Sequence, residues 1–495
     1  MRKDIVSGCF AFEPWKFHPK NASFEPTDSH DRILIEVIEF QHVRYPVAEQ
    51  TSDEAYRLSL SETGDVVLSF MHPLGGLRAL TTFSQLFYKH SDENLALTPY
   101  SPHVPLIISD FPAFKHRGLN LDISRNIITP PEVMRTIEAL AFNKFNRLHL
   151  HASDAQSWPL EIPALPDLAV KGSYHPSQIW TVEDLQEVQT FGAYRGVQVY
   201  LEIDMPGHTA SIHAAYPDLL QSYNRQPWPE FSAQPCAGQF KLDYPPVLDF
   251  TETLLNDLLP RVSPFSSLFH IGGDEVNAKA YDMKPAELKP HLQSFVNHAL
   301  QVVRNHSLTP IVWEEHVLDF NLTFPAETIV QIWRANTKSG RSALAEVVER
   351  GHQALFGPYN HWYLDCGHGG WLDPDLDNPE SLIRAPYLDY CGPYKNWREI
   401  YAYEPLKDIP KGQQHLVLGG EVHMWGEQTD GMNLDNNLWP RVAAAGEVLW
   451  KGKGEVSEDV TRRLAMMRER LVAKGFAAGP VQVTWCLMNP GNCKA

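Results

Sequence analysis

The sequence has 495 residues, 43% of them hydrophobic, so the chain is long enough to bury two cores. It contains no apolar run of about 18 residues, no repeat and no low-complexity tract, which argues against a membrane-spanning helix or a repeat architecture. The formal net charge of -18 argues against nucleic acids and anionic membranes as partners.

Short apolar runs alternate with segments of helical pattern along most of the chain. Two helices are predicted at residues 130–145, opened by Thr129 and two prolines, and at 182–194, where Thr181 and Asp184 have capping-box spacing. Eight strands are predicted at residues 117–123, 147–151, 197–203, 266–272, 310–314, 328–333, 353–359 and 415–425. This rhythm predicts an α/β fold, a closed (β/α)8 TIM barrel. A doubly wound open sheet is the alternative, but no glycine-rich phosphate fingerprint follows the first strand.

Polar residues cluster at the carboxyl ends of these runs, where a parallel barrel builds its active site. The most informative segment is 270–276, in which Asp274 and Glu275 follow a glycine pair. Like charges held close together raise one pKa, which would keep one carboxyl protonated as a general acid near neutral pH. In strand geometry the two side chains would point to opposite faces. The alternative interpretation is a surface turn with a structural ion pair.

Seven ordered motifs carry a resemblance from about residue 77 onward. They are residues 117–125, 149–156, 202–208 and 270–276, followed by 363–365, 425–427 and 439–441. The chain resembles the β-N-acetylhexosaminidases of glycoside hydrolase family 20, and residues 80–87 are most similar to fungal members. The resemblance implies a small α+β domain at residues 1–107, a catalytic barrel at 108–480 and a tail at 481–495.

The family activity is exo-acting removal of terminal β-linked N-acetylglucosamine or N-acetylgalactosamine with retained configuration. An ordinary retaining enzyme needs two carboxyl groups about 5 Å apart across the sugar, and adjacent residues are poorly placed for that. By resemblance, Glu275 is the general acid and base, while Asp274 orients the acetamido group that attacks the anomeric carbon. Tyr363 donates to the acetamido oxygen, and His208 with Asp154 orients Glu275.

Sugar hydroxyls need polar partners, and the apolar face of the ring needs aromatic walls. By resemblance, the polar partners are Arg125, Asp365 and Glu427, whereas Arg117 supports the barrel. The aromatic walls are assigned to Trp313, Trp333, Trp397 and Trp425. The expected partner is an oligosaccharide or glycoconjugate that ends in N-acetylhexosamine, such as a chitooligosaccharide. Fungal members suggest a homodimer, which no sequence feature requires.

Cysteines and sequons favour the secretory pathway, either secretion or a vacuolar or lysosomal location, although no apolar signal segment follows Met1. Two disulfides are plausible from spacing, Cys486 with Cys493 and Cys366 with Cys391, while Cys9 and Cys236 have no obvious partners. Glycosylation sequons begin at Asn21, Asn305 and Asn321.

Two other functions compete with the hydrolase. A non-catalytic sugar-binding barrel would predict loss of Asp274 or Glu275, and both are present. A metal-dependent hydrolase could use His149 and His151, which strand alternation places on one face, joined by Asp154 or Asp204. No metal-binding motif accompanies them, and the family calls for neither metal nor cofactor, so we expect none.

Overall fold

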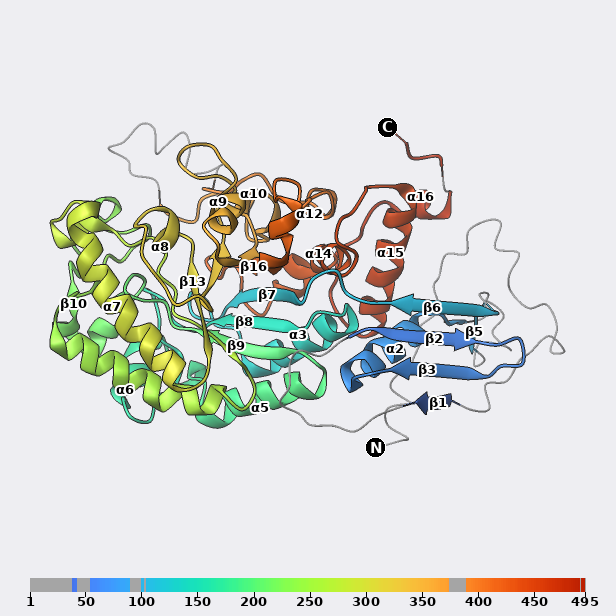
Figure 1. The fold of residues 1–495 in the computed structure, drawn as a ribbon, viewed down its shortest axis with the longest axis horizontal. Helices are drawn as coiled ribbons and strands as arrows, with labels where there is room; N and C mark the ends of the chain where they lie inside the picture. Colours follow the sequence, from blue (N-terminus) through green and yellow to red (C-terminus); the bar gives the residue numbers. More distant parts are fainter. Residues whose placement is uncertain are drawn as a thin grey trace.

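A computed structural model describes residues 38–41, 54–89, 99–101, 104–373, 389–489 and 491–494. Eight parallel strands close into a barrel in the order β12-β13-β14-β15-β16-β7-β8-β9 (Figure 1). Their bounds are β7 His116–Asp122, β8 Arg147–His151, β9 Gln198–Glu202, β12 Leu268–His270, β13 Thr309–Trp313, β14 Ile329–Ile332, β15 Gln353–Phe356 and β16 Val417–Met424. Each strand falls within or overlaps one of the eight predicted runs, so the (β/α)8 prediction is confirmed.

Helices connect the strands and cover the outside of the barrel (Figure 1). The first predicted helix, α3, begins as expected but ends at Phe142, because Lys144 has a positive φ of 62° that a helix cannot include. The second, α5, matches its prediction: the Thr181 and Asp184 side chains each accept the other residue's backbone N–H, at 3.1 and 2.9 Å. Barrel helices are α3 Pro130–Phe142, α4 Asp167–Gly172, α5 Val182–Tyr194, α6 Pro245–Val262, α7 Pro285–Asn305, α8 Glu315–Leu318, α9 Ala343–Glu349, α10 Tyr359–Trp362, α12 Trp397–Tyr401, α13 Leu434–Leu438 and α14 Arg441–Lys451.

The main hydrophobic core lies between the strands and these helices. Helix α7 shows why: Leu288, Leu292, Phe295 and Val296 recur at three- and four-residue spacing and are buried against the barrel. The inside of the barrel is different, because Glu202, Glu421 and several histidines are buried there among smaller apolar layers. Polar groups buried at that depth must be paired, and their pairing bears on the site described below.

A small α+β unit precedes the barrel, as predicted. Its sheet has the order β1-β3-β2-β6, with β1 Ile38–Gln41, β2 Tyr56–Leu60, β3 Val66–Phe70 and β6 Leu106–Asp110. Helix α2, Pro73–Gln85, buries Ala79 and Phe83 against this sheet. Two-stranded ribbons are formed by β4 Tyr88–Lys89 with β5 Pro99–Tyr100, and by β10 Leu220–Gln221 with β11 Gln239–Phe240 in the barrel. The domain boundary near residue 107 remains a prediction.

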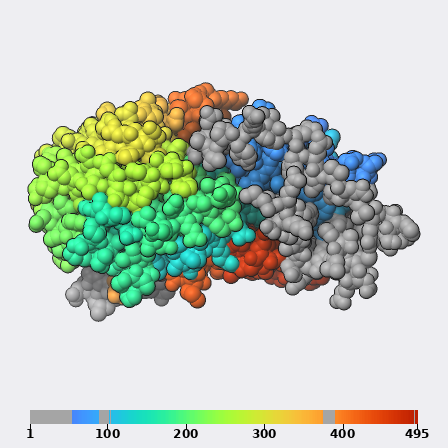
Figure 2. Space-filling model, turned by 90° about the horizontal axis from the view of Figure 1, so that it is seen from below, coloured from blue at the N-terminus to red at the C-terminus, as the bar shows by residue number. Residues whose placement is uncertain are grey.

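A buried ion cluster joins the small unit to the barrel. Glu54 accepts from Arg78 Nε at 2.8 Å and from Arg117 Nη2 at 2.5 Å, while Arg78 Nη2 also donates to the Phe145 carbonyl at 2.8 Å. Burial alone would raise the pKa of Glu54, but the two guanidinium groups lower it to about 2. Arg117 therefore supports the fold, as expected. Figure 2 shows barrel residues, green and yellow, on one side and the blue N-terminal residues toward the other.

The C-terminal segment contains α15, Glu458–Ala473, and α16, Thr484–Met488. Both suggested disulfides are present, Cys486 with Cys493 and Cys366 with Cys391. Cys236 is a free cysteine, whereas Cys9 and the Asn21 sequon lie outside the described residues. The other two sequon asparagines, Asn305 and Asn321, are exposed. Within the described ranges, no helix is both long enough and apolar enough to cross a membrane.

Candidate active site

The predicted catalytic residues meet at the carboxyl rim of the barrel. Arg125 follows β7, Asp154 follows β8 and His208 follows β9. Asp274 and Glu275 follow β12. The aromatic and remaining polar candidates follow later strands, with Trp313 ending β13, Trp333 following β14, Tyr363 and Asp365 following α10, and Trp425 and Glu427 following β16. Barrel closure therefore gathers side chains that are far apart in the sequence.

The backbone around Asp274 corrects one expectation. Strand β12 ends at His270, so Asp274 and Glu275 lie in a loop, and Glu275 has a left-handed φ of 53°. Instead of pointing to opposite faces, both carboxyl groups face His208 Nε2, at 3.8 Å for Asp274 Oδ2 and 3.2 Å for Glu275 Oε2. The preceding Gly272 is required, because a Cβ there would collide with the Asp204 carboxyl group.

His208 connects Glu275 to a buried aspartate. Its Nδ1 lies 3.1 Å from Asp154 Oδ1, and its Nε2 faces Glu275. Asp154 is also held by Arg125 Nη2 at 2.9 Å and His151 Nε2 at 2.7 Å. Burial would raise the pKa of Asp154, but Arg125 and His208 hold it well below its usual range. Burial would lower the pKa of His208, but the surrounding carboxylates, Asp154 foremost, raise it well above its usual value. These contacts orient the carboxyl group of Glu275, whose side chain is 33% exposed.

Asp204 is a site residue that the sequence analysis considered only as a metal ligand. One carboxyl oxygen of Asp204, one of Asp274 and one ring nitrogen of His208 all lie within 4.8 Å of one another. Burial raises the pKa of Asp204 to about 6, although the positive charge of His208 opposes the rise. Burial, with the negative charge of Asp204 beside it, raises the pKa of Asp274 well above its usual range. The two carboxyl groups therefore share a proton over part of the pH range. The position of Asp204 just past β9, four residues before His208, was the available signal.

Aromatic side chains form one wall beside these acids. Trp313, Tyr363 and Trp425 are buried in one cluster, with Trp333 packed against it. Ring centroids lie 6.3 Å apart for Trp313 and Trp425 and 6.4 Å apart for Trp333 and Tyr363. Trp397 does not join them, because it begins α12 and packs in the main hydrophobic core. Its sequence position near a strand end could not reveal that helix packing.

The polar sugar-binding candidates form a second group. Arg125 Nε lies 3.6 Å from Glu427 Oε1, and Gln234 bridges them by accepting from Arg125 Nε at 3.0 Å and donating to Glu427 Oε1 at 2.7 Å. Gln234 lies on an irregular loop and carries no motif, so sequence reasoning missed it. Burial, together with the nearby Glu427 charge, raises the pKa of Asp365 well above its usual range. Asp365 Oδ1 and Glu427 Oε2 are buried acceptors without a protein donor, which suits ligand hydroxyl groups.

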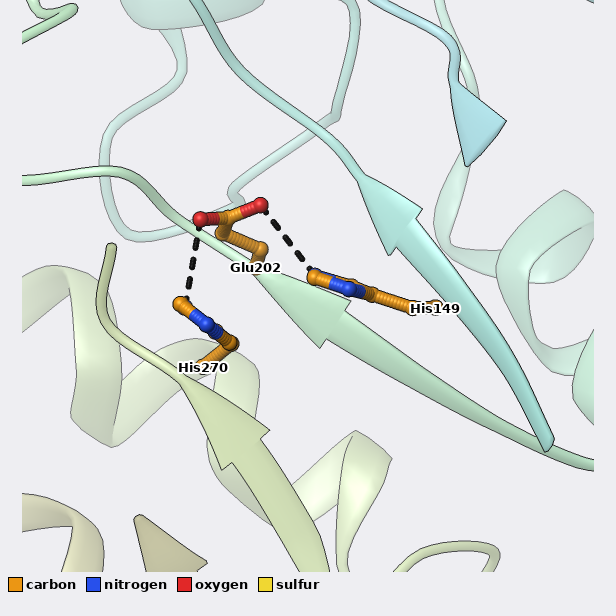
Figure 3. A group of neighbouring side chains, drawn as sticks. All are labelled: His149, Glu202 and His270. Atoms are coloured by element: carbon orange, nitrogen blue, oxygen red, sulfur yellow. Dashed lines mark ion pairs between the residues drawn. The ribbon is translucent and has the colours of Figure 1, made fainter. Parts of the chain in front are cut away.

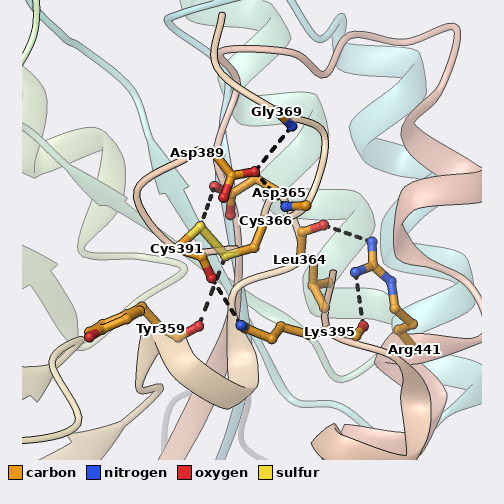
Figure 4. Close-up of a disulfide and its surroundings, with 10 residues drawn as sticks. Tyr359, Leu364, Asp365, Cys366, Gly369, Asp389, Cys391, Lys395 and Arg441 are labelled. Carbon is orange, nitrogen blue, oxygen red and sulfur yellow. Dashed lines mark hydrogen bonds between the residues drawn. A yellow bond between two sulfur atoms is a disulfide. The ribbon is translucent and has the colours of Figure 1, made fainter. Parts of the chain in front are cut away.

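A disulfide supports the loop that presents Tyr363 and Asp365 (Figure 4). The Cys391 sulfur lies 4.0 Å from Asp365 Oδ2, and Cys391 is bonded to Cys366, which directly follows Asp365. Arg441 Nη2 donates to the Leu364 carbonyl at 2.7 Å, which explains the arginine of the 439–441 motif. Covalent and hydrogen-bonded support on both sides limits the freedom of this loop.

The histidines considered as metal ligands are engaged with carboxylates. Donor atoms of His149, Glu202 and His270 lie within 4.8 Å of one another (Figure 3). Glu202 also accepts from His151 Nδ1 and Trp313 Nε1, each at 2.6 Å. A bound cation would have to displace the protons of several of these contacts. That no metal is needed remains a prediction.

Comparisons with known proteins agree on a family. Residues 114–453 match the family model described as glycosyl hydrolase family 20, catalytic domain, and residues 4–86 match one described as beta-acetyl hexosaminidase like. The chain is 45% identical, over 98% of its length and 82% of the relative's, to a beta-hexosaminidase of Arthroderma benhamiae. It is 31% identical to beta-hexosaminidase subunit beta of Homo sapiens, covering 96% of this chain and 81% of that one.

Solved structures share the fold. The family 20 exo beta-N-acetylglucosaminidase from Vibrio harveyi, in complex with N-acetylglucosamine, has a TM-score of 0.74 at 23% identity, covering 90% of this chain and 70% of that chain. The family 20 beta-N-acetylhexosaminidase from Streptomyces coelicolor has a TM-score of 0.70 at 25% identity, covering 89% and 85%.

Proposed function

This chain belongs to glycosyl hydrolase family 20, and we propose that its rim residues carry out substrate-assisted hydrolysis with Glu275 as the general acid and base. It is an exo-acting β-N-acetylhexosaminidase, a glycoside hydrolase whose substrates are glycans that contain N-acetylhexosamine. The proposed natural substrates are chitooligosaccharides or glycan termini with β-linked N-acetylglucosamine or N-acetylgalactosamine.

One observation carries the proposed mechanism: Asp274 and Glu275 face the same imidazole nitrogen of His208. A retaining enzyme with a protein nucleophile holds its two carboxyl groups about 5 Å apart on either side of the anomeric carbon. Two neighbouring side chains that converge on one nitrogen do not straddle a sugar ring. The attacking group must then come from the substrate, and the acetamido oxygen is suitably close to its own anomeric carbon.

In the first step Glu275 donates its proton to the glycosidic oxygen as the bond from that oxygen to the anomeric carbon breaks. The acetamido oxygen attacks the same carbon, which gives an oxazolinium ring and the free leaving alcohol. Water then attacks the anomeric carbon, Glu275 takes its proton, and the ring opens to the product with retained configuration. His208 keeps Glu275 oriented in both steps.

Asp274 has a separate role toward the acetamido group. Its carboxylate accepts from the amide N–H and stabilises the positive charge that develops on that nitrogen. Tyr363 donates its hydroxyl to the acetamido oxygen. The Oδ1 atom of Asp274 supports this role, because it is buried and has no protein donor. Trp313, Trp333 and Trp425 wall the sugar.

Hydrolysis of an aryl β-N-acetylglucosaminide tests these roles, using the wild type and Glu275→Gln with and without a thiazoline that mimics the oxazolinium ring. Removing the acid should lower kcat by about 10²- to 10⁴-fold. The thiazoline should inhibit the wild type, and a chelator in a parallel sample should not. Inhibition by the chelator alone would favour the metal-dependent alternative. Binding of sugar without turnover by the wild type would favour the sugar-binding barrel.

We also propose a secretory location and a homodimer. The two disulfides and the exposed Asn305 and Asn321 sequons support the location. A mobility shift after enzymatic removal of N-glycans from the protein expressed in its native host would test it. Light scattering on the eluted peak of a sizing column would test the dimer, and a monomer mass would contradict it.

A further inference from the structure

Glu202 is a buried carboxylate with four polar neighbours at the carboxyl end of β9. Oε2 lies 2.6 Å from His151 Nδ1 and 3.1 Å from His149 Nε2. Oε1 lies 2.6 Å from Trp313 Nε1 and 3.1 Å from His270 Nδ1. Figure 3 shows Glu202 between the imidazoles of His149 and His270, the two more distant neighbours. The two short contacts lead to different parts of the active site.

The first short contact leads to the proposed acid. His151 places Nδ1 on Glu202 Oε2 at 2.6 Å and Nε2 on Asp154 Oδ2 at 2.7 Å. A carboxylate can only accept, so both ring nitrogens of His151 must carry protons, and the ring is a cation. That cation is one of the donors that hold Asp154, whose other oxygen holds His208 against Glu275. An alternating row of carboxylates and imidazoles thus runs from the barrel interior to the reacting proton.

The second short contact leads to the sugar wall. Trp313 is 1% exposed, and its indole N–H donates to Glu202 Oε1. The same ring packs 6.3 Å from Trp425 and 4.8 Å from His270, measured between ring centroids. An indole whose N–H is fixed by a charged acceptor cannot turn in its plane without breaking a charge-assisted hydrogen bond.

We propose that Glu202 is a positioning residue that sets both the Asp154–His208–Glu275 row and the orientation of Trp313. This inference rests on the proposed roles of Glu275 and Trp313. One side chain therefore couples the alignment of the acid to the shape of the aromatic wall beside the sugar. Neither the acid nor the wall depends on Glu202 touching the substrate, since Glu202 is fully buried.

Replacement of Glu202 by glutamine would disturb both contacts through chemistry rather than size. His151 and Trp313 both donate to the Glu202 carboxylate, whereas the amide of glutamine can accept from only one of them and presents an N–H to the other. Because the Trp313 indole can only donate, it keeps the amide oxygen, and the amide N–H faces His151 Nδ1, which must then accept. His151 would hold one proton instead of two, so Asp154 would lose a charged donor. His151 lies nearer to Asp154 than Glu202 does, so the acid row loses local positive charge, and its apparent pKa values should rise.

Other titratable groups also face Glu202, and a control must share them. From the two neighbouring strands, β8 and β12, these are His149, His151 and His270. From β16 it is His423, and from its own strand and the following loop they are Tyr200 and Asp204.

Glu421 provides the matched control. It is equally buried and contacts His116, Tyr200, His149 and Gln331, at distances between 2.6 and 3.1 Å. None of these partners belongs to the proposed catalytic or wall residues. Glu202→Gln and Glu421→Gln each remove one buried charge from the same barrel interior.

The experiment compares the wild type, Glu275→Gln, Glu202→Gln and Glu421→Gln with aryl β-N-acetylglucosaminides. For Glu202→Gln we expect kcat/KM to fall roughly 10- to 100-fold, and the pH profile to move upward by about half a unit. The loss should shrink with a better leaving group, which needs less protonation. Glu421→Gln should keep its pH profile at a comparable unfolding midpoint.

Two results would overturn the inference: a wild-type rate and pH profile in Glu202→Gln, or the same losses in Glu421→Gln. If Glu202→Gln does not fold, His151→Gln removes the cation and leaves the Trp313 contact in place. That variant should move the pH profile, and an unmoved profile would likewise refute the proposal. A wild type without turnover would instead refute the proposed function.

Discussion

Replacing Asp204 with asparagine should change how the stability of the protein depends on pH. In the folded protein burial raises the pKa of Asp204 from 3.8 to about 6, against the opposing positive charge of His208 and with a smaller contribution from the negative charge of Glu202. A carboxyl group whose folded pKa is raised stabilises the fold fully below its unfolded pKa, and the contribution is lost as pH rises through the folded value. For Asp204 the window is therefore 3.8 to about 6.

The magnitude of this change in stability follows from the shift in the pKa of Asp204. Asp204 is 1% exposed, so solvent screens it little, and a rise from 3.8 to about 6 corresponds to roughly 3 kcal/mol of folding free energy. Asparagine keeps the oxygen that accepts the Gly273 N–H at 2.8 Å, so the backbone turn is preserved. It removes the negative charge beside Asp274, which lowers the pKa of Asp274 and adds to the effect in the same direction.

Urea unfolding followed by tryptophan fluorescence between about pH 4 and pH 7 measures this prediction. Relative to the wild type, Asp204→Asn should gain roughly 3 kcal/mol of unfolding free energy as pH rises across that range. Asp249→Asn, on the exposed face of α6, is the control and should run parallel to the wild type. A constant difference between Asp204→Asn and the wild type would refute the shared proton.

Two further predictions concern the loop that carries Tyr363 and Asp365. Tyr363→Phe should lower kcat about 10²-fold on an aryl β-N-acetylglucosaminide, because one donor to developing charge is lost; a raised KM with unchanged kcat would show that the hydroxyl only binds substrate. Replacing both Cys366 and Cys391 with alanine should lower the unfolding free energy by about 3.5 kcal/mol, since their bond closes a loop of 25 residues, and should raise KM through the Asp365 loop. Removal of the C-terminal disulfide should leave KM unchanged, and equal KM changes in the two variants would contradict this.

Local pattern determined most of the architecture. Apolar runs of strand length alternating with helical segments specify a parallel barrel, because each element must bury one face and the chain has few ways to do so. The capping residues of α5 located its beginning and the motif residues located the rim, since carboxyl ends of parallel strands share one edge. These properties depend on neighbours in the sequence, so the sequence alone was enough to predict them.

Only the tertiary structure decided which rim residues act together. Trp313 meets Glu202 across 111 positions, and Gln234 meets Glu427 across 193, contacts for which no local periodicity exists. The convergence of Asp274 and Glu275 on one histidine required the strand to end at His270, which no pattern of apolar residues marks. Side-chain contacts across a barrel depend on closure and register, whereas sequence patterns report only which way each element faces.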